Sequence, residues 1–130
     1  MQFLNIRVTV VTIITASSFL FAITSLADNR VINAARHVGQ ARASADVCPT
    51  LSYNRKAAVI LAATMNIRYR RFEPGGTQYL FVVKAYEETK LAFERDPQRS
   101  VQSAACYGGE ALYGPNGINV PELLLVVDGE

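Results

Sequence analysis

Residues 57–65 read Ala57-Ala58-Val59-Ile60-Leu61-Ala62-Ala63-Thr64-Met65, an apolar run with a single hydroxyl. Its alanine content favours a helix over a strand. The run is apolar on every side, which is typical of a helix buried all round, and it is too short to span a bilayer. We therefore predict a helix over about 50–67 that forms the centre of the core.

Helical patterns lie on both sides of this segment. Before it, apolar residues recur at three- and four-residue spacing over 28–45, which predicts a helix. Gly39 inside that helix would cost about 1 kcal/mol relative to alanine. After the central run, the sequence predicts two more helices, one over 77–95 and one from 97 to about 107. The expected fold is all-α, a small domain of about four helices.

Two short segments leave an α+β alternative open. Residues 79–83 are rich in aromatic and β-branched side chains, which favour a strand. The charged residues that follow favour a helix there instead. The apolar segment 122–127 fits either a helical turn or a strand. A segment so apolar is expected to dock on the core or to contact a partner.

The N-terminal segment 1–27 predicts the compartment. Arg7 is the only charged side chain before an uncharged, mostly apolar stretch over 8–23. Small residues at positions 25 and 27 then precede the charge of Asp28, which is the order of a secretory signal. We predict cleavage between Ala27 and Asp28, a single compact domain over 28–130, and a periplasmic or secreted location. A retained membrane anchor is the alternative; after cleavage no stable anchor is expected.

The two cysteines are interpreted in that compartment. Cys48 and Cys106 are the only cysteines, so an exported protein would join them in one disulfide. Closing a loop of about 58 residues would stabilise the fold by about 4 kcal/mol. A metal site is not expected, because His37 is the only histidine and there is no Cys-x-x-Cys. No other cofactor is expected either.

A basic segment and a turn are the candidates for partner binding. A net charge of only +2 and the predicted export argue against a nucleic-acid partner. The expected partner is another envelope protein. Arginines alternate with aromatic residues over 68–72, and turn residues fill 113–117. The candidate contact residues are Arg68, Tyr69, Arg70, Arg71, Tyr113 and Asn116.

The chain lacks the motifs of common catalytic sites. His37 is the only histidine available to a Ser-His-acid triad, and no Gly-x-Ser-x-Gly accompanies it. The sequence therefore predicts a non-catalytic binding protein of the inhibitor, immunity or chaperone type. One alternative is a small envelope hydrolase that uses a carboxylate from Glu73, Glu87, Glu88 or Asp96. The other is a membrane-anchored accessory subunit with an uncleaved leader.

Overall fold

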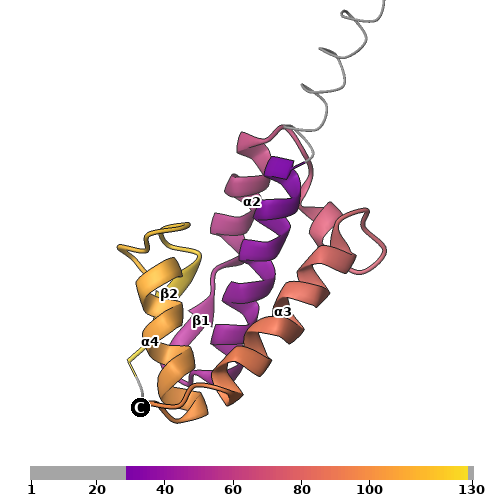
Figure 1. The fold of residues 1–130 in the computed structure, drawn as a ribbon. Coiled ribbons are helices and arrows are strands. Elements are labelled where there is room, and N and C mark those ends of the chain that lie inside the picture. The colour runs from indigo at the N-terminus through magenta and orange to yellow at the C-terminus, as the bar shows by residue number, and fades with distance from the viewer. Residues whose placement is uncertain (1–28, 129–130) are drawn as a thin grey trace, which may run out of the picture. The chain divides into compact units, whose positions relative to one another are not determined.

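The computed structural model describes residues 29–128; the predicted leader and the Ala27–Asp28 cleavage site lie outside them. In this part of the chain a helix over 29–47 precedes the other elements (Figure 1). These are β1 (Leu51–Tyr53), α2 (Arg55–Thr64), the 3-10 helix η1 (Tyr69–Phe72), α3 (Tyr79–Glu94), α4 (Val101–Tyr113) and β2 (Leu124–Val126). The predicted class, a small helical domain with one disulfide, is confirmed.

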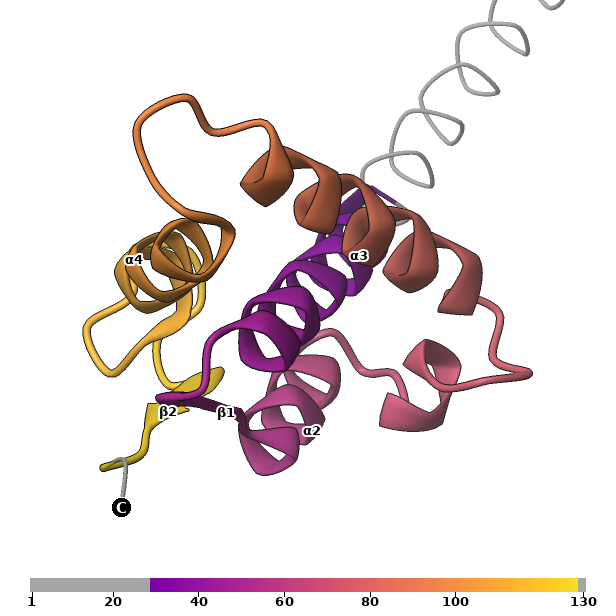
Figure 2. The same cartoon turned by 90° about the horizontal axis from the view of Figure 1, so that it is seen from below.

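The helix over 29–47 lies at the centre of the domain. Figure 2 shows it between α2 and α3, with α4 on a third side. Its inward residues are small, and Ala35, Val38 and Ala41 have no exposed surface. Side chains this short let neighbouring helices approach closely, so the core is built by close backbone packing as well as by large apolar residues.

The prediction that α2 is the central helix is wrong. Only Ala58 and Ala62 of α2 are buried, whereas Val59 and Ile60 are 41% and 57% exposed. The helix covers one side of helix 29–47, so only one of its faces is buried. An apolar composition all round does not require contacts all round, because a folded surface retains much apolar area.

Glycines mark the places where helices come closest to their neighbours. A Cβ on Gly39 would lie 2.2 Å from the carbonyl oxygen of Val82 in α3. A Cβ on Gly109 would lie 2.7 Å from Cβ of Ser44, which belongs to helix 29–47. Gly39 was expected to weaken its helix, yet it is the residue that permits the contact between helix 29–47 and α3.

The predicted start of the α2 helix at about residue 50 is also wrong. Residues 51–53 form β1, which pairs with β2 in an antiparallel two-stranded sheet. Leu51 lies opposite Val126, and Tyr53 lies opposite Leu124. Helix α2 begins only after Asn54, whose side chain accepts a hydrogen bond from the main-chain N–H of Ala57. The helix predicted over 77–95 is confirmed by α3, and the alternative strand at 79–83 does not form. Segment 122–127 fitted either a helical turn or a strand, and its residues 124–126 form β2.

Helix α4 differs from the prediction at both ends. It begins at Val101 rather than near Pro97, and Ser100 caps it by accepting a hydrogen bond from the N–H of Ser103. It continues through Gly108 and ends at Tyr113 instead of near residue 107. A glycine pair inside a helix is tolerated here because Gly109 is a packing position against Ser44 and Leu51.

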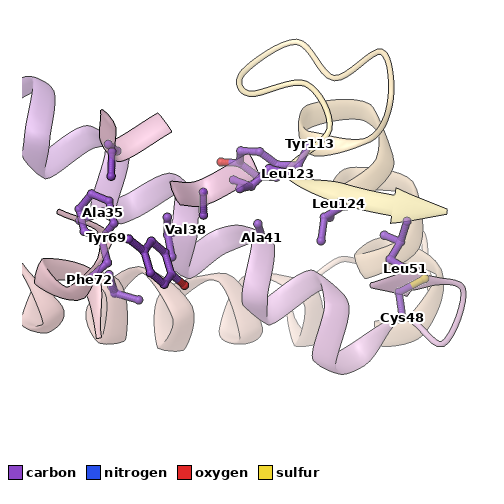
Figure 3. Close-up of a cluster of buried hydrophobic side chains, with 14 of the residues drawn as sticks. Ala35, Val38, Ala41, Cys48, Leu51, Tyr69, Phe72, Tyr113, Leu123 and Leu124 are labelled. Atoms are coloured by element: carbon purple, nitrogen blue, oxygen red, sulfur yellow. The ribbon is translucent and has the colours of Figure 1, made fainter. Parts of the chain in front are cut away.

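The predicted disulfide joins Cys48 and Cys106, whose Cα atoms lie 5.0 Å apart. Cys48 follows directly after helix 29–47, so the bond connects the end of the central helix to α4. Figure 3 shows Cys48 near Leu51, at one end of the cluster of buried side chains. Leu123 and Leu124 complete this cluster, and both are fully buried. The first two apolar residues of the C-terminal segment therefore dock on the core, whereas Leu125, Val126 and Val127 are exposed.

No helix within 29–128 is both long and apolar enough to cross a bilayer.

Candidate functional site

The basic segment 68–71 lies on and beside the 3-10 helix η1. Tyr69 and Phe72 point into the core, with exposures of 6% and 0%. Arg68, Arg70 and Arg71 are exposed. The alternation seen in the sequence thus separates a buried aromatic side, which anchors η1, from a charged side that faces solvent.

The three arginines line one hollow. This arginine hollow, about 680 Å³ in volume, is formed by residues 66–68, 70–71 and 73–77. Gly76 allows the loop to return against η1, because a Cβ there would lie 2.4 Å from the carbonyl oxygens of both Arg70 and Arg71. The N–H of Gln78 then donates to the carbonyl of Arg71 over 2.9 Å, which closes the loop. The hollow is therefore held by main-chain contacts.

None of the three arginines forms an ion pair within 29–128. Glu73 lines the same hollow, but its Oε1 pairs with Arg55 Nη2 at 2.9 Å. Among residues 29–128, ion pairs form only between Arg55 and Glu73 and between Lys84 and Glu88. The guanidinium groups of Arg68, Arg70 and Arg71 thus have no carboxylate partner in this part of the chain, and each retains its fork of donors for an external anion.

Two of the predicted contact residues are buried. Tyr69 was predicted to contact a partner directly, and this prediction is wrong because its side chain is buried. Tyr69 instead anchors η1 on the core. Tyr113 was expected in an exposed turn, but it is the last residue of α4 and is 1% exposed. Figure 3 shows it among the buried side chains beside Leu123. Asn116 is exposed, and it does not line the arginine hollow.

A second concavity lies beside Tyr69. This tyrosine pocket, about 520 Å³ in volume, is lined by residues of helix 29–47, β1, η1 and α3 and by Arg55. Its tyrosines are Tyr53, Tyr69, Tyr79 and Tyr86. Arg42 Nη2 donates to Tyr69 Oη over 2.7 Å, and the hydroxyls of Tyr69 and Tyr53 are 2.9 Å apart. The guanidinium carbon of Arg42 also lies 5.0 Å from the centre of the Tyr53 ring.

Two phenols of this pocket, those of Tyr53 and Tyr86, stay neutral at physiological pH. Burial and the hydrogen bond with Tyr69 raise the pKa of Tyr53 above its ordinary value. The hydrogen bond that Tyr86 donates to Asp46, together with burial, raises the pKa of Tyr86 to about 12. Neither phenol can therefore supply a negative charge to Arg42.

His37 takes part in a third polar cluster. Its Nδ1 lies 2.8 Å from Tyr113 Oη, and Tyr113 in turn donates to Gln40 Oε1. Burial lowers the pKa of His37 below its ordinary value and raises that of Tyr113 to about 12. The cluster connects α4 to helix 29–47, because His37 and Gln40 belong to that helix and Tyr113 is the last residue of α4.

The sequence pointed to the arginine hollow but missed the tyrosine pocket. Arg68, Arg70 and Arg71 are close in the chain, so their density is visible in the sequence. Arg42, Tyr53 and Tyr69 come from three separate elements, and no spacing rule connects them. Within 29–128, no three histidine, cysteine or acidic side chains gather where they could hold a metal ion.

No known protein family, curated protein or solved structure matches this chain.

Proposed function

We propose that this chain is an exported, disulfide-bonded, non-catalytic protein that binds another envelope protein. In this proposal the arginine hollow receives an acidic segment of the partner. The order of charges over 1–27 supports export. The Cys48–Cys106 disulfide fits an oxidising compartment such as the periplasm or the exterior.

One observation carries the binding part of the proposal: Arg68, Arg70 and Arg71 line the same hollow, and no carboxylate within 29–128 pairs with them. Three exposed cations around one hollow give it a positive potential that attracts an anionic partner. Arginine suits protein carboxylates because its planar fork donates two parallel hydrogen bonds.

The proposal is tested by capture from the extracytoplasmic fraction of the source cell. A protein with Arg68, Arg70 and Arg71 replaced by glutamine is compared with wild type. The matched control replaces Arg36, Lys56 and Arg95, three exposed cations outside the hollow, and therefore removes the same charge. We expect the hollow variant to lose a partner that wild type and control retain. Added salt should release that partner from wild type, because exposed charges are screened.

Two results would contradict the proposal. If the hollow variant and the control capture the same partners equally, the hollow is not the contact surface. If a C-terminally tagged protein stays in the cytoplasm at full length, the export on which the proposal depends is wrong.

A further inference from the structure

Arg42 is a half-buried cation whose contacts within the described residues are with neutral groups. Its Nη2 donates to Tyr69 Oη, and its guanidinium stacks on the Tyr53 ring. An arginine carries five N–H donors; one donates to Tyr69, and Tyr53 is a second hydrogen-bond partner within reach. The remaining donors lie on a side chain that lines the tyrosine pocket.

No acid around the tyrosine pocket forms an ion pair with Arg42 within 29–128. Asp46 lies one turn further along the same helix, and it accepts a hydrogen bond from Tyr86 instead. Glu73 pairs with Arg55. Glu87 also lines the pocket, but it is exposed, and no ion pair forms between it and Arg42 in this part of the chain. A charge that is partly removed from water gains most from an anionic partner with matching geometry.

The pocket offers that partner a preformed place. The hydroxyl of Tyr69 accepts a hydrogen bond from the Arg42 guanidinium, and it forms a second hydrogen bond with the hydroxyl of Tyr53. These bonds fix the position of the guanidinium. Fixing the side chain in advance reduces the entropy lost on binding. The other walls include Val82, Val83 and Tyr79, which suit an apolar body, and about 520 Å³ is a volume typical of small-ligand sites.

We propose that the tyrosine pocket binds a carboxylate carried on an apolar or aromatic group, with the guanidinium of Arg42 as the anchor of the carboxylate. Asp46 and Glu87 also line the pocket, so their negative charges favour a ligand with one carboxylate over a ligand with two. Two sources offer this chemistry: a free small acid, or the C-terminal residue of a protein. The pocket is separate from the arginine hollow, so its ligand does not depend on the partner proposed above.

The test compares two probes that differ in charge alone. N-acetyl-L-phenylalanine has a free carboxylate, and N-acetyl-L-phenylalaninamide is its neutral counterpart. Each is titrated into the oxidised protein, which is expressed with residues 1–27 included, and binding is followed by NMR. We expect the acid to bind in a saturable manner. The amide should bind at least about tenfold more weakly than the acid, because a hydrogen bond to a charged group is lost.

Variants locate the site. Arg42→Gln should weaken binding of the acid about tenfold or more, whereas Arg70→Gln, in the arginine hollow, should leave it unchanged. The acid–amide comparison uses wild type alone, so it remains decisive even where Arg42→Gln fails to fold. A tripeptide that ends in phenylalanine distinguishes the sources: tighter binding than that of the acetylated amino acid indicates a protein C-terminus, and equal or weaker binding indicates a free acid.

Three outcomes overturn the proposal. The first is equal affinity for acid and amide, because the carboxylate would then contribute nothing. The second is an absence of saturable binding of the acid up to its solubility limit. The third is a folded Arg42→Gln variant with unchanged affinity for the acid, because the anchor would then lie elsewhere.

Discussion

His37 is a residue whose protonation the fold opposes. Tyr113 donates its one hydroxyl proton to Gln40, so it accepts from Nδ1–H of a neutral His37. Burial lowers the pKa of this imidazole below its ordinary value of about 6.5. The unfolded chain, where His37 has its ordinary pKa, therefore binds the proton more readily than the folded chain does.

This difference predicts a pH dependence of stability. As the pH falls from about 7.5 through 6.5, the unfolded state takes up a proton that the folded state resists, so the free energy of unfolding decreases. The variant His37→Gln should lose this part of the decrease. Urea unfolding at several pH values, followed by far-UV circular dichroism, measures it in both proteins.

The carboxylates contribute equally to the pH dependence of stability in both proteins. The difference between wild type and His37→Gln therefore isolates the contribution of His37. The same change of stability with pH in wild type and His37→Gln would show that His37 is equally easy to protonate in the folded and unfolded states. That result would contradict the burial of its ring against Tyr113.

At the residue scale, the sequence is informative about clusters that are local in the chain. Arg68, Arg70 and Arg71 were predicted as a candidate site because they stand almost side by side, and the structure places all three around one hollow. The sequence could not reveal that Tyr69, which lies between these arginines, is buried. An aromatic residue beside arginines fits either stacking at the surface or packing in the core. Arg42 gave no signal, since its partners belong to β1 and η1, which are distant from it in the sequence.

At the element scale, the contact between helix 29–47 and α3 depends on the missing side chain of Gly39. Gly39→Ala would place a Cβ 2.2 Å from the Val82 carbonyl oxygen, so the helices would have to move apart. We expect a loss of about 2 kcal/mol in the free energy of unfolding, because overpacking outweighs the better helix propensity of alanine. Denaturant unfolding of the oxidised protein measures the change.

Gly108 provides the matched control in α4. A Cβ at this position would meet no atom within 4 Å. Gly108→Ala should therefore stabilise the protein, by about 0.5–1 kcal/mol, through helix propensity alone. Equal effects of the two substitutions would mean that close packing at Gly39 does not determine the helix arrangement.

The elements that the sequence misplaced share one physical cause. Helix propensity and apolar periodicity are local, but the burial of an element depends on what packs against it. The alanine-rich face of helix 29–47 has modest hydrophobicity, and it nevertheless becomes the centre because its small residues admit neighbours on several sides. Strand β1 was missed because its partner, β2, is the last element of the described chain and lies far from it in sequence.

At the scale of the whole molecule, the disulfide joins the central helix to α4 across 58 residues of sequence. Replacing both Cys48 and Cys106 by alanine should lower the free energy of unfolding by about 4 kcal/mol, because the unfolded chain regains the entropy of an open loop. Since Cys48 is buried, alanine avoids placing a hydroxyl in the core. Denaturant unfolding of the variant and of oxidised wild type gives the difference.

A loss below about 1 kcal/mol would contradict this estimate. It would indicate that residual structure already restricts the unfolded, reduced chain. Mass spectrometry of unreduced, alkylated protein from the source cell is the accompanying control; two free thiols would show that the bond does not form there.

The central claim is that the arginine hollow contacts a protein partner, and site-specific photo-crosslinking in the source cell tests it most directly. Thr77 is exposed and lines the hollow, so a photoreactive phenylalanine at this position leaves all three arginines in place. Gln98 is equally exposed in the loop before α4, outside the hollow, and serves as the control position.

The claim predicts a covalent adduct with one partner from position 77 and none from position 98. It also predicts that the adduct disappears when Arg68, Arg70 and Arg71 are replaced by glutamine. An absence of adducts from position 77, or the same adducts from both positions, would contradict it.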